Sequence, residues 1–410
     1  IWSFQETSHD LWNLDLSSPP IIHDFRIDGK IIEAVIVPTK IGNTLFLERN
    51  TGKPIYDIFY KESPKSDVPG ELASNKQIFI EKPEKFAKFE YDKNDFNDLG
   101  LSKKKEIESL IKNSKFGWYE TPSFNHDLIL YGIHGGAQWH GAALDPLNQY
   151  LYIPSNNIPW RIKLYMSSIG DKSNIPKKFF NIDKVYRNKC SACHGENRNG
   201  LIEKNIETRV KYIPSLVGNI FKNNDYKTKF LDEEYINSIH RKKLISKKEM
   251  KELNEYFNWW DNQLYREKKI IVHGDYRTIS RLLTSDGLPA SNPPWGFIVK
   301  LDLKTGKILF KQPIGFLNNK DKPIGTKIFG GLSATSGNLI FANGTEDGIA
   351  YALNANNGEI LWTYQMEAAG SAPPTIFTID NKQYVTFLAT GGGYLSYKKK
   401  GSTIYTFSIN

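Results

Sequence analysis

Leu301-Asp302-Leu303-Lys304-Thr305-Gly306-Lys307 is the stretch that decides the fold, because its pattern recurs in the chain. An apolar strand end, a polar turn closed by glycine and a second strand ending in an aromatic residue return at residues 353–359 and 46–53. Glycine suits such a turn because it adopts positive φ without steric cost. The step from Gly306 to Gly358 is 52 residues, close to the about 40–50 residues of one propeller blade. We therefore predict a mainly β chain that forms a β-propeller.

The composition agrees with a folded chain of this class. Of the 410 residues, 40% are hydrophobic and 13% aromatic, which suits the packing between propeller blades. No stretch approaches the ~18 consecutive apolar residues of a membrane span. The net charge of +9 is spread along the chain, which favours a solvated basic surface and predicts no nucleic-acid partner.

Both cysteines of the chain lie in one motif, Cys190-Ser191-Ala192-Cys193-His194. This spacing is typical of covalent c-type haem attachment, in which two thiols one turn apart bind the haem and the adjacent histidine ligates its iron. A redox dithiol does not require the histidine, and a zinc site requires a second cysteine pair. We predict that Cys190 and Cys193 attach a haem and that His194 is its proximal ligand. Such attachment occurs outside the bacterial cytoplasm, so a periplasmic location is implied.

Residues 180–265 around this motif resemble a small all-α class I cytochrome c domain, inserted between propeller segments 1–175 and 270–410. Residues 185–189 predict a helix before the motif. Ser246 and Glu249 form a capping box that opens a second helix. The distal haem ligand stays open between His240, Met250 and none. Met250 shares an apolar helix face with other residues, which is more typical of a core methionine.

The flanking segments resemble the C-terminal part of the pyrroloquinoline quinone (PQQ)-dependent dehydrogenases, the quinoproteins, and most of all the membrane-bound glucose/quinate/glycerol type. The matching runs are residues 2–12, 38–54, 66–71, 135–139, 294–297 and 330–385. The resemblance implies an eight-bladed propeller that holds PQQ near its axis together with a divalent cation, Ca or Mg. Some relatives carry an inserted cytochrome domain at about this place.

The resemblance also implies an incomplete propeller, because the family's catalytic domain begins well before the part that this chain matches. At about 50 residues a blade, the roughly 315 residues outside the cytochrome-like segment allow about six blades at most. We expect a preceding segment, or a partner chain carrying it, to supply the remaining blades, the ring that stacks on PQQ and most metal ligands. Such a segment anchors relatives to the inner membrane. Residues 1–5 are expected to form a strand.

The family motif His-Asp-x-Trp-Asp ends in the aspartate that acts as general base, and here that position is Asn13. A neutral amide can form hydrogen bonds but cannot take the proton of an alcohol. Asp10 and Asp15 are the candidates for a substitute base. Strand alternation would place Asp15 on the same face as Asn13. Crippled catalysis is the alternative.

Three further residues match cofactor-binding positions of the family. Lys40 matches the lysine that hydrogen-bonds the reactive quinone oxygens, where a cation stabilises developing negative charge. Gln138 and Trp139 match a segment that lies beside the cofactor in relatives, although plain propeller core is an equal alternative for them.

The expected function is therefore that of a dehydrogenase. It would oxidise an alcohol, polyol or sugar with PQQ and send the electrons through the haem to a downstream quinone or cytochrome. The alternative is a catalytically degenerate propeller that serves as an electron-transfer or binding protein, which Asn13 favours.

Overall fold

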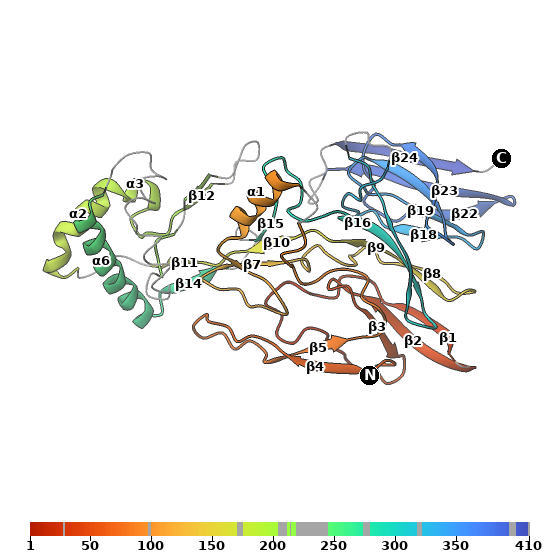
Figure 1. Cartoon of the computed structure of the whole chain (residues 1–410), viewed down its shortest axis with the longest axis horizontal. Helices are drawn as coiled ribbons and strands as arrows, with labels where there is room; N and C mark the ends of the chain where they lie inside the picture. The colour runs from red at the N-terminus through yellow and green to blue at the C-terminus, as the bar shows by residue number, and fades with distance from the viewer. Residues whose placement is uncertain are drawn as a thin grey trace.

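The computed structural model describes residues 1–27, 29–96, 100–169, 175–203, 211–213, 215–218, 245–273, 279–317, 322–392 and 399–408. The fold is mainly β, as predicted, and most of its strands belong to antiparallel sheets (Figure 1). None of the helices in these residues is long and apolar enough to cross a lipid bilayer.

The sheets are built from short strands, and some of the sheets pair strands that lie far apart in the chain. The first two sheets are β1-β2-β3 (Ile21–Ile27, Lys30–Pro38, Thr44–Glu48) and β4-β5 (Ile58–Glu62, Lys76–Ile80). A four-stranded sheet of order β15-β10-β7-β6 contains Ile279–Arg281, Trp160–Ile162, Asp127–Leu130 and Ser114–Lys115. A single helix, α1 (Leu101–Ile111), precedes β6.

The remaining propeller strands form three more sheets. One has the order β17-β16-β9-β8 (Ile308–Pro313, Gly296–Asp302, Tyr150–Asn156, Ala143–Asp145). The next is β18-β19-β20-β21 (Leu332–Ala334, Leu339–Ala342, Ile349–Asn354, Ile360–Gln365). The last described sheet has three strands, β22-β23-β24 (Thr375–Ile379, Lys382–Gly391, Lys400–Ser408).

The three repeated turns adopt the same conformation. Gly52, Gly306 and Gly358 have φ angles of 71°, 69° and 79°, and each donates its N–H to the carbonyl four residues earlier at 2.8 Å. Strands pair across the second and third turns, as predicted. The strand expected after Gly52 does not form, since Pro54 makes only an isolated bridge to Leu47 and proline has no N–H to extend a ladder.

Apolar layers join successive sheets face to face. Phe297 on β16 packs towards the first sheet, together with Phe25 and Phe46. Its neighbour Ile298 points to the opposite face and packs with Tyr351 of β20. Alternate residues of one strand thus fill two cores, because successive side chains of a strand point to opposite faces. This succession of sheets buried on both faces is the packing expected between propeller blades.

A helical segment, defined here as residues 175–266, lies at one end of the molecule (Figure 1). It is entered and left through β11 (Tyr165–Ser168) and β14 (Ile270–His273), which pair with each other. It contains η2 (Lys177–Phe179), α2 (Phe180–Lys189), α3 (Ser191–His194), the pair β12 (Leu201–Glu203) and β13 (Lys211–Ile213), and α6 (Lys247–Arg266).

The helical segment has its own core between α2 and α6. Tyr186 of α2 packs edge-on against Phe257 of α6, with ring centroids 5.6 Å apart. The predicted capping box is present, because Ser246 and Glu249 exchange side-chain and backbone hydrogen bonds at the start of α6. Met250 lies inside this core at 7% exposure.

The strand predicted at the start of the chain is also wrong. Residues 1–5 form no strand, and the first strand begins at Ile21. Trp2 instead covers the turn at Gly52, where its Nε1 donates to the carbonyl of Arg49 at 2.8 Å. The apolar residues near the start of the chain therefore pack on a turn rather than in a sheet.

Candidate functional site

Lys40, in the turn between β2 and β3, lies at the centre of the candidate site. Its side chain is only 6% exposed. Its Nζ donates to the carbonyl of Asn13 at 3.1 Å and to the carboxylate of Asp15, whose side chain is 59% exposed. The structure thus brings three of the predicted site residues together around one buried ammonium group.

The turn that presents Asn13 depends on Asp10. The two carboxylate oxygens of Asp10 accept the N–H groups of Trp12 at 2.8 Å and Leu14 at 2.6 Å. Asn13 has φ 63°, a left-handed conformation that asparagine tolerates, and its backbone carbonyl faces Lys40. Asp10 therefore shapes the turn with both oxygens. The strand alternation expected for Asn13 and Asp15 is wrong, since this stretch is a turn.

Residues 135–139 approach this site very closely. Gly136 has φ 55°, and a Cβ there would lie 2.4 Å from the carbonyl oxygens of Thr39 and Lys40. Gln138 is buried, and its Nε2 donates to the carbonyl of Gly135 at 2.8 Å, so it supports its own turn. Trp139 is 44% exposed, so part of its flat ring is open to a ligand.

Aromatic rings hold Trp139 in place. It stacks on Phe329 with centroids 5.6 Å apart and ring planes at 10°. His134 packs edge-on against Phe329 at 5.7 Å and against Trp160 of β10 at 4.7 Å. The exposed indole face is thereby fixed by a buried layer behind it.

Three cations converge on His134. The pKa of His134 is lowered to about 4, first because the ring is buried and then because Arg281, Lys40 and Lys327 lie near it. Lys327 has a side chain only 5% exposed and pairs with Glu346 at 2.8 Å. The imidazole is thus neutral at pH 7, and the surrounding field favours an anionic ligand. The sequence patterns identified Lys40 but missed Arg281 and Lys327, although Lys327 lies just before the matching run at residues 330–385.

A buried acidic residue lies behind the lysine turn. Glu6 is 2% exposed and accepts a hydrogen bond from Asn43 Nδ2 at 2.8 Å through Oε1. Burial raises its pKa to about 7, against hydrogen bonds from Asn43 and Thr39 that lower it. Its Oε2 has no hydrogen-bond partner. No sequence pattern singled out this residue.

The cysteine motif forms one helical turn. The N–H groups of Cys193 and His194 donate to the carbonyl of Cys190 at 3.2 and 3.0 Å. His194 is 7% exposed, whereas Cys193 is exposed, and neither sulfur is in a disulfide. Burial raises the pKa of the Cys190 thiol to about 11, which is the opposite of a reactive redox thiolate. Two thiols and a buried imidazole on one turn suit covalent haem attachment.

The described residues support neither candidate for the distal ligand of the predicted haem. His240 lies outside the described residues, and Met250 belongs to the core of the helical segment. Among the residues that the structure describes, no group of three or more histidine, cysteine, aspartate or glutamate side chains is arranged to hold a metal ion.

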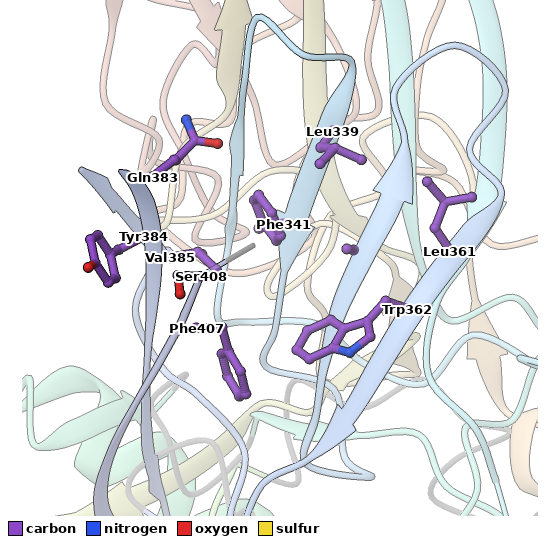
Figure 2. A pocket seen from close by; sticks show the side chains of 10 residues that line it. Leu339, Phe341, Leu361, Trp362, Gln383, Tyr384, Val385, Phe407 and Ser408 are labelled. Atoms are coloured by element: carbon purple, nitrogen blue, oxygen red, sulfur yellow. The ribbon is translucent and has the colours of Figure 1, made fainter. Parts of the chain in front are cut away.

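A cavity of about 340 Å³ lies away from both sites, between the last two sheets (Figure 2). Its walls are largely apolar, and Phe341, Trp362 and Phe407 point into the gap. It shares no lining residue with the Lys40 site. The charged and aromatic groups around Lys40 have the chemistry of a polar cofactor site, which this apolar cavity lacks, so we locate the candidate site at Lys40.

Comparison with known proteins gives a consistent result. The family model for the PQQ-type glucose/ethanol/alcohol dehydrogenase β-propeller domain matches residues 1–206 and 222–385. Quinoprotein glucose dehydrogenase A of Acinetobacter calcoaceticus is 24% identical over 425 residues, covering 100% of this chain and 42% of that protein. Quinate/shikimate dehydrogenase (quinone) of Acinetobacter baylyi is 23% identical over 408 residues, covering 95% and 40%.

The chain spans about two fifths of the length of these curated relatives. A crystal structure of quinohemoprotein alcohol dehydrogenase from Comamonas testosteroni is similar at a TM-score of 0.49 and 17% identity, covering 100% of this chain and 40% of that one.

Proposed function

Because the chain belongs to the family of PQQ-type glucose/ethanol/alcohol dehydrogenase β-propellers, we propose that it works as part of a quinoprotein dehydrogenase. Its substrate would be the CH–OH group of an alcohol, polyol or sugar. The observation that carries this proposal is the buried Lys40 ammonium group, which lies between the Asn13 carbonyl and the Asp15 carboxylate.

The described residues fit PQQ as a ligand. PQQ is a flat tricarboxylate with an ortho-quinone, and the cations Lys40, Arg281 and Lys327 would balance its charge. The exposed face of Trp139 would lie against its ring plane. When bound, PQQ supplies the hydride-accepting chemistry. Lys40 would stabilise negative charge on the quinone oxygen.

We further propose that the substrate proton is taken by Asp15 rather than by Asn13. Asn13 carries a neutral amide, and only its backbone carbonyl meets Lys40. Asp15 lies beside the same ammonium group, and its side chain is 59% exposed, so its carboxylate is open to a substrate bound at this site. Both oxygens of Asp10 are engaged by backbone N–H groups, so Asp10 is the weaker candidate.

The proposed route for electrons is a c-type haem on the helical segment, which would then be an inserted cytochrome c domain. Cys190 and Cys193 would attach it, and His194 would ligate its iron. Two electrons and two protons would leave the alcohol: the electrons would pass singly to a quinone or cytochrome, with the haem supplying the one-electron chemistry, and the protons would go to solvent. Because bacteria form such thioethers outside the cytoplasm, we place the protein in the periplasm.

An eight-bladed propeller and a Ca or Mg ion complete the proposal. The ion's ligands would come from a preceding segment or a partner chain, which would also supply the remaining blades. Attachment to the inner membrane would reside in that segment.

A second function is favoured by one observation. Asn13 replaces the residue that acts as base in the family, so a degenerate propeller that only transfers electrons or binds a partner is the competing proposal.

Reconstitution of the full-length protein with PQQ and Ca²⁺ tests the first function. We expect dye reduction with at least one alcohol, polyol or sugar, and a loss of about 10²–10⁴-fold in Asp15→Asn, the range of general-base catalysis. Lys53→Ala, in an exposed turn, is the matched control. A haem that dithionite reduces, together with no dye reduction on any substrate, would support the second function instead.

A further inference from the structure

Strand β11, which leads into the helical segment, has two edges with different partners. On one edge Ser168 faces Ile270 of β14. On the other edge it meets Asn199, in the loop that follows α3. The haem-attachment loop therefore touches the strand that connects it to the propeller.

The contact between Asn199 and Ser168 is a paired hydrogen bond. The Ser168 N–H donates to Asn199 Oδ1 at 2.8 Å, and Asn199 Nδ2 donates to the Ser168 carbonyl at 3.0 Å. The asparagine amide thus satisfies both backbone groups as a neighbouring strand would. The Ser168 hydroxyl also donates to the backbone carbonyl of Asn197 at 3.2 Å. Ser168 is 7% exposed, so these bonds are shielded from water.

The Asn199–Ser168 pair is connected through the backbone to the predicted haem ligand. The N–H of Gly200, the next residue, donates to the carbonyl of His194 at 2.9 Å. An apolar contact lies beside it: Met166 of β11 is 2% exposed and packs with Val217. A Cβ on Gly218, where φ is 83°, would lie 2.1 Å from Met166 Cε. The loop therefore sits on β11 through polar contacts, and the nearby segment 215–218 sits on the same strand through close apolar contacts.

The strand before β11 in the chain reaches the candidate cofactor site. Strand β10 begins at Trp160, whose ring lies 4.7 Å from that of His134. Only two residues separate β10 from β11. One short run, residues 160–168, thus joins the surroundings of Lys40 and Trp139 to the loop that carries His194.

We propose that Asn199 is a positioning residue for electron transfer between the two sites. Its amide holds the haem-attachment loop on β11 and so fixes the haem relative to the propeller. The inference rests on the proposed function. In each transfer a ferric haem gains one electron and becomes ferrous, the reduced cofactor loses that electron, and no bond to the protein forms or breaks.

The test compares Asn199→Ala with Asn197→Ala in the full-length protein loaded with haem, PQQ and Ca²⁺. Alanine at 197 keeps the backbone carbonyl that Ser168 uses, so this variant is the matched control. Substrate-driven growth of the reduced-haem absorption band is followed by anaerobic stopped flow. Dye reduction that bypasses the haem, the haem reduction potential and hydrogen exchange of the Ser168 amide are measured in parallel.

In Asn199→Ala we expect haem reduction to slow about tenfold, because both shielded hydrogen bonds to the Ser168 backbone are lost, together with one from the Ser168 hydroxyl. The haem potential stays unchanged, dye reduction stays within about twofold and Ser168 exchange accelerates. Asn199→Asp keeps the acceptor but loses the donor. Its rate of haem reduction should therefore lie between those of the wild-type protein and Asn199→Ala. The positioning role is overturned if the rate of haem reduction in Asn199→Ala equals that of the wild-type protein. It is also overturned if the rate of dye reduction falls by the same factor as the rate of haem reduction. If no substrate reduces the haem of the wild-type protein, the proposed function is overturned instead. That holds even if Asn199→Ala still accelerates hydrogen exchange of the Ser168 amide.

Discussion

The buried carboxyl group of Glu6 shows how a single residue couples the candidate site to pH. It lies under the turn that carries Lys40, since Asn43 of that turn donates a hydrogen bond to it. An ionised carboxylate in this position lacks water and a counter-ion in direct contact. The protonated form is therefore the one that the fold prefers.

Glu6 predicts a loss of stability as the pH rises. Its pKa is about 7 in the folded chain against the ordinary value of 4.5, so the proton is held more tightly in the folded state. This contribution is fully present below pH 4.5 and is lost as the pH rises through 7, at most about 3 kcal/mol in total. Glu6→Gln should abolish that part of the pH dependence in urea unfolding at pH 5 and pH 8. An unchanged dependence in Glu6→Gln would contradict this assignment.

Sequence patterns identified some residues of the site because those residues lie in motifs. Lys40 and Asp15 were found in this way, and the structure brings them into contact. Glu6 and Arg281 were missed, because burial and the approach of charges from distant strands are tertiary properties. Asn199 was missed for the same reason: its function depends on Ser168, 31 residues away.

At the scale of elements, the glycine-closed turns define where strands begin and end. Each turn needs a left-handed residue, and Gly52 has an additional constraint. A Cβ on Gly52 would lie 2.3 Å from the ring of Trp2, which is held by its hydrogen bond to Arg49. Position 52 therefore requires glycine both for its positive φ and for the lack of a Cβ against Trp2.

Gly52→Ala should destabilise the chain more than Gly287→Ala does. Both glycines have positive φ, but a Cβ at Gly287 meets nothing within 4 Å. Backbone strain alone should cost about 1 kcal/mol at Gly287, whereas displacement of Trp2 should raise the cost at Gly52 to at least about 2 kcal/mol. Thermal unfolding with tryptophan fluorescence measures both effects. Equal costs for the two variants would argue against the Trp2 contact.

The elements that were predicted correctly carry local signals. The capping box at Ser246 fixed the start of α6, and glycine fixed the turns at Gly306 and Gly358. Residues 1–5 and 10–15 were misread because alternating apolar residues look alike in a strand and in a loop that packs on a neighbouring turn. The carboxylate of Asp10, which caps backbone N–H groups locally, is the signal that indicates a turn there.

At the scale of the whole molecule, the sheets follow one another from β1-β2-β3 to β22-β23-β24, and the helical segment lies at the opposite end from the last sheet (Figure 1). The short run 160–168 connects the segment to the candidate site. This arrangement leaves the outer face of the last sheet open in the described part of the chain, where Phe377, Leu388 and Ile404 are 38%, 39% and 66% exposed.

The exposed edge of the last sheet should make the chain self-associate. Strand β24 is nine residues long and pairs only with β23 among the described strands, so one row of its backbone groups is a template for another chain. We expect the 410-residue chain, purified by itself, to form edge-to-edge dimers and larger species as its concentration rises. Ile404→Lys should suppress them in sedimentation velocity, whereas Leu147→Lys, in the exposed turn between β8 and β9, should not. If both variants sediment as the parent does, the association surface lies elsewhere.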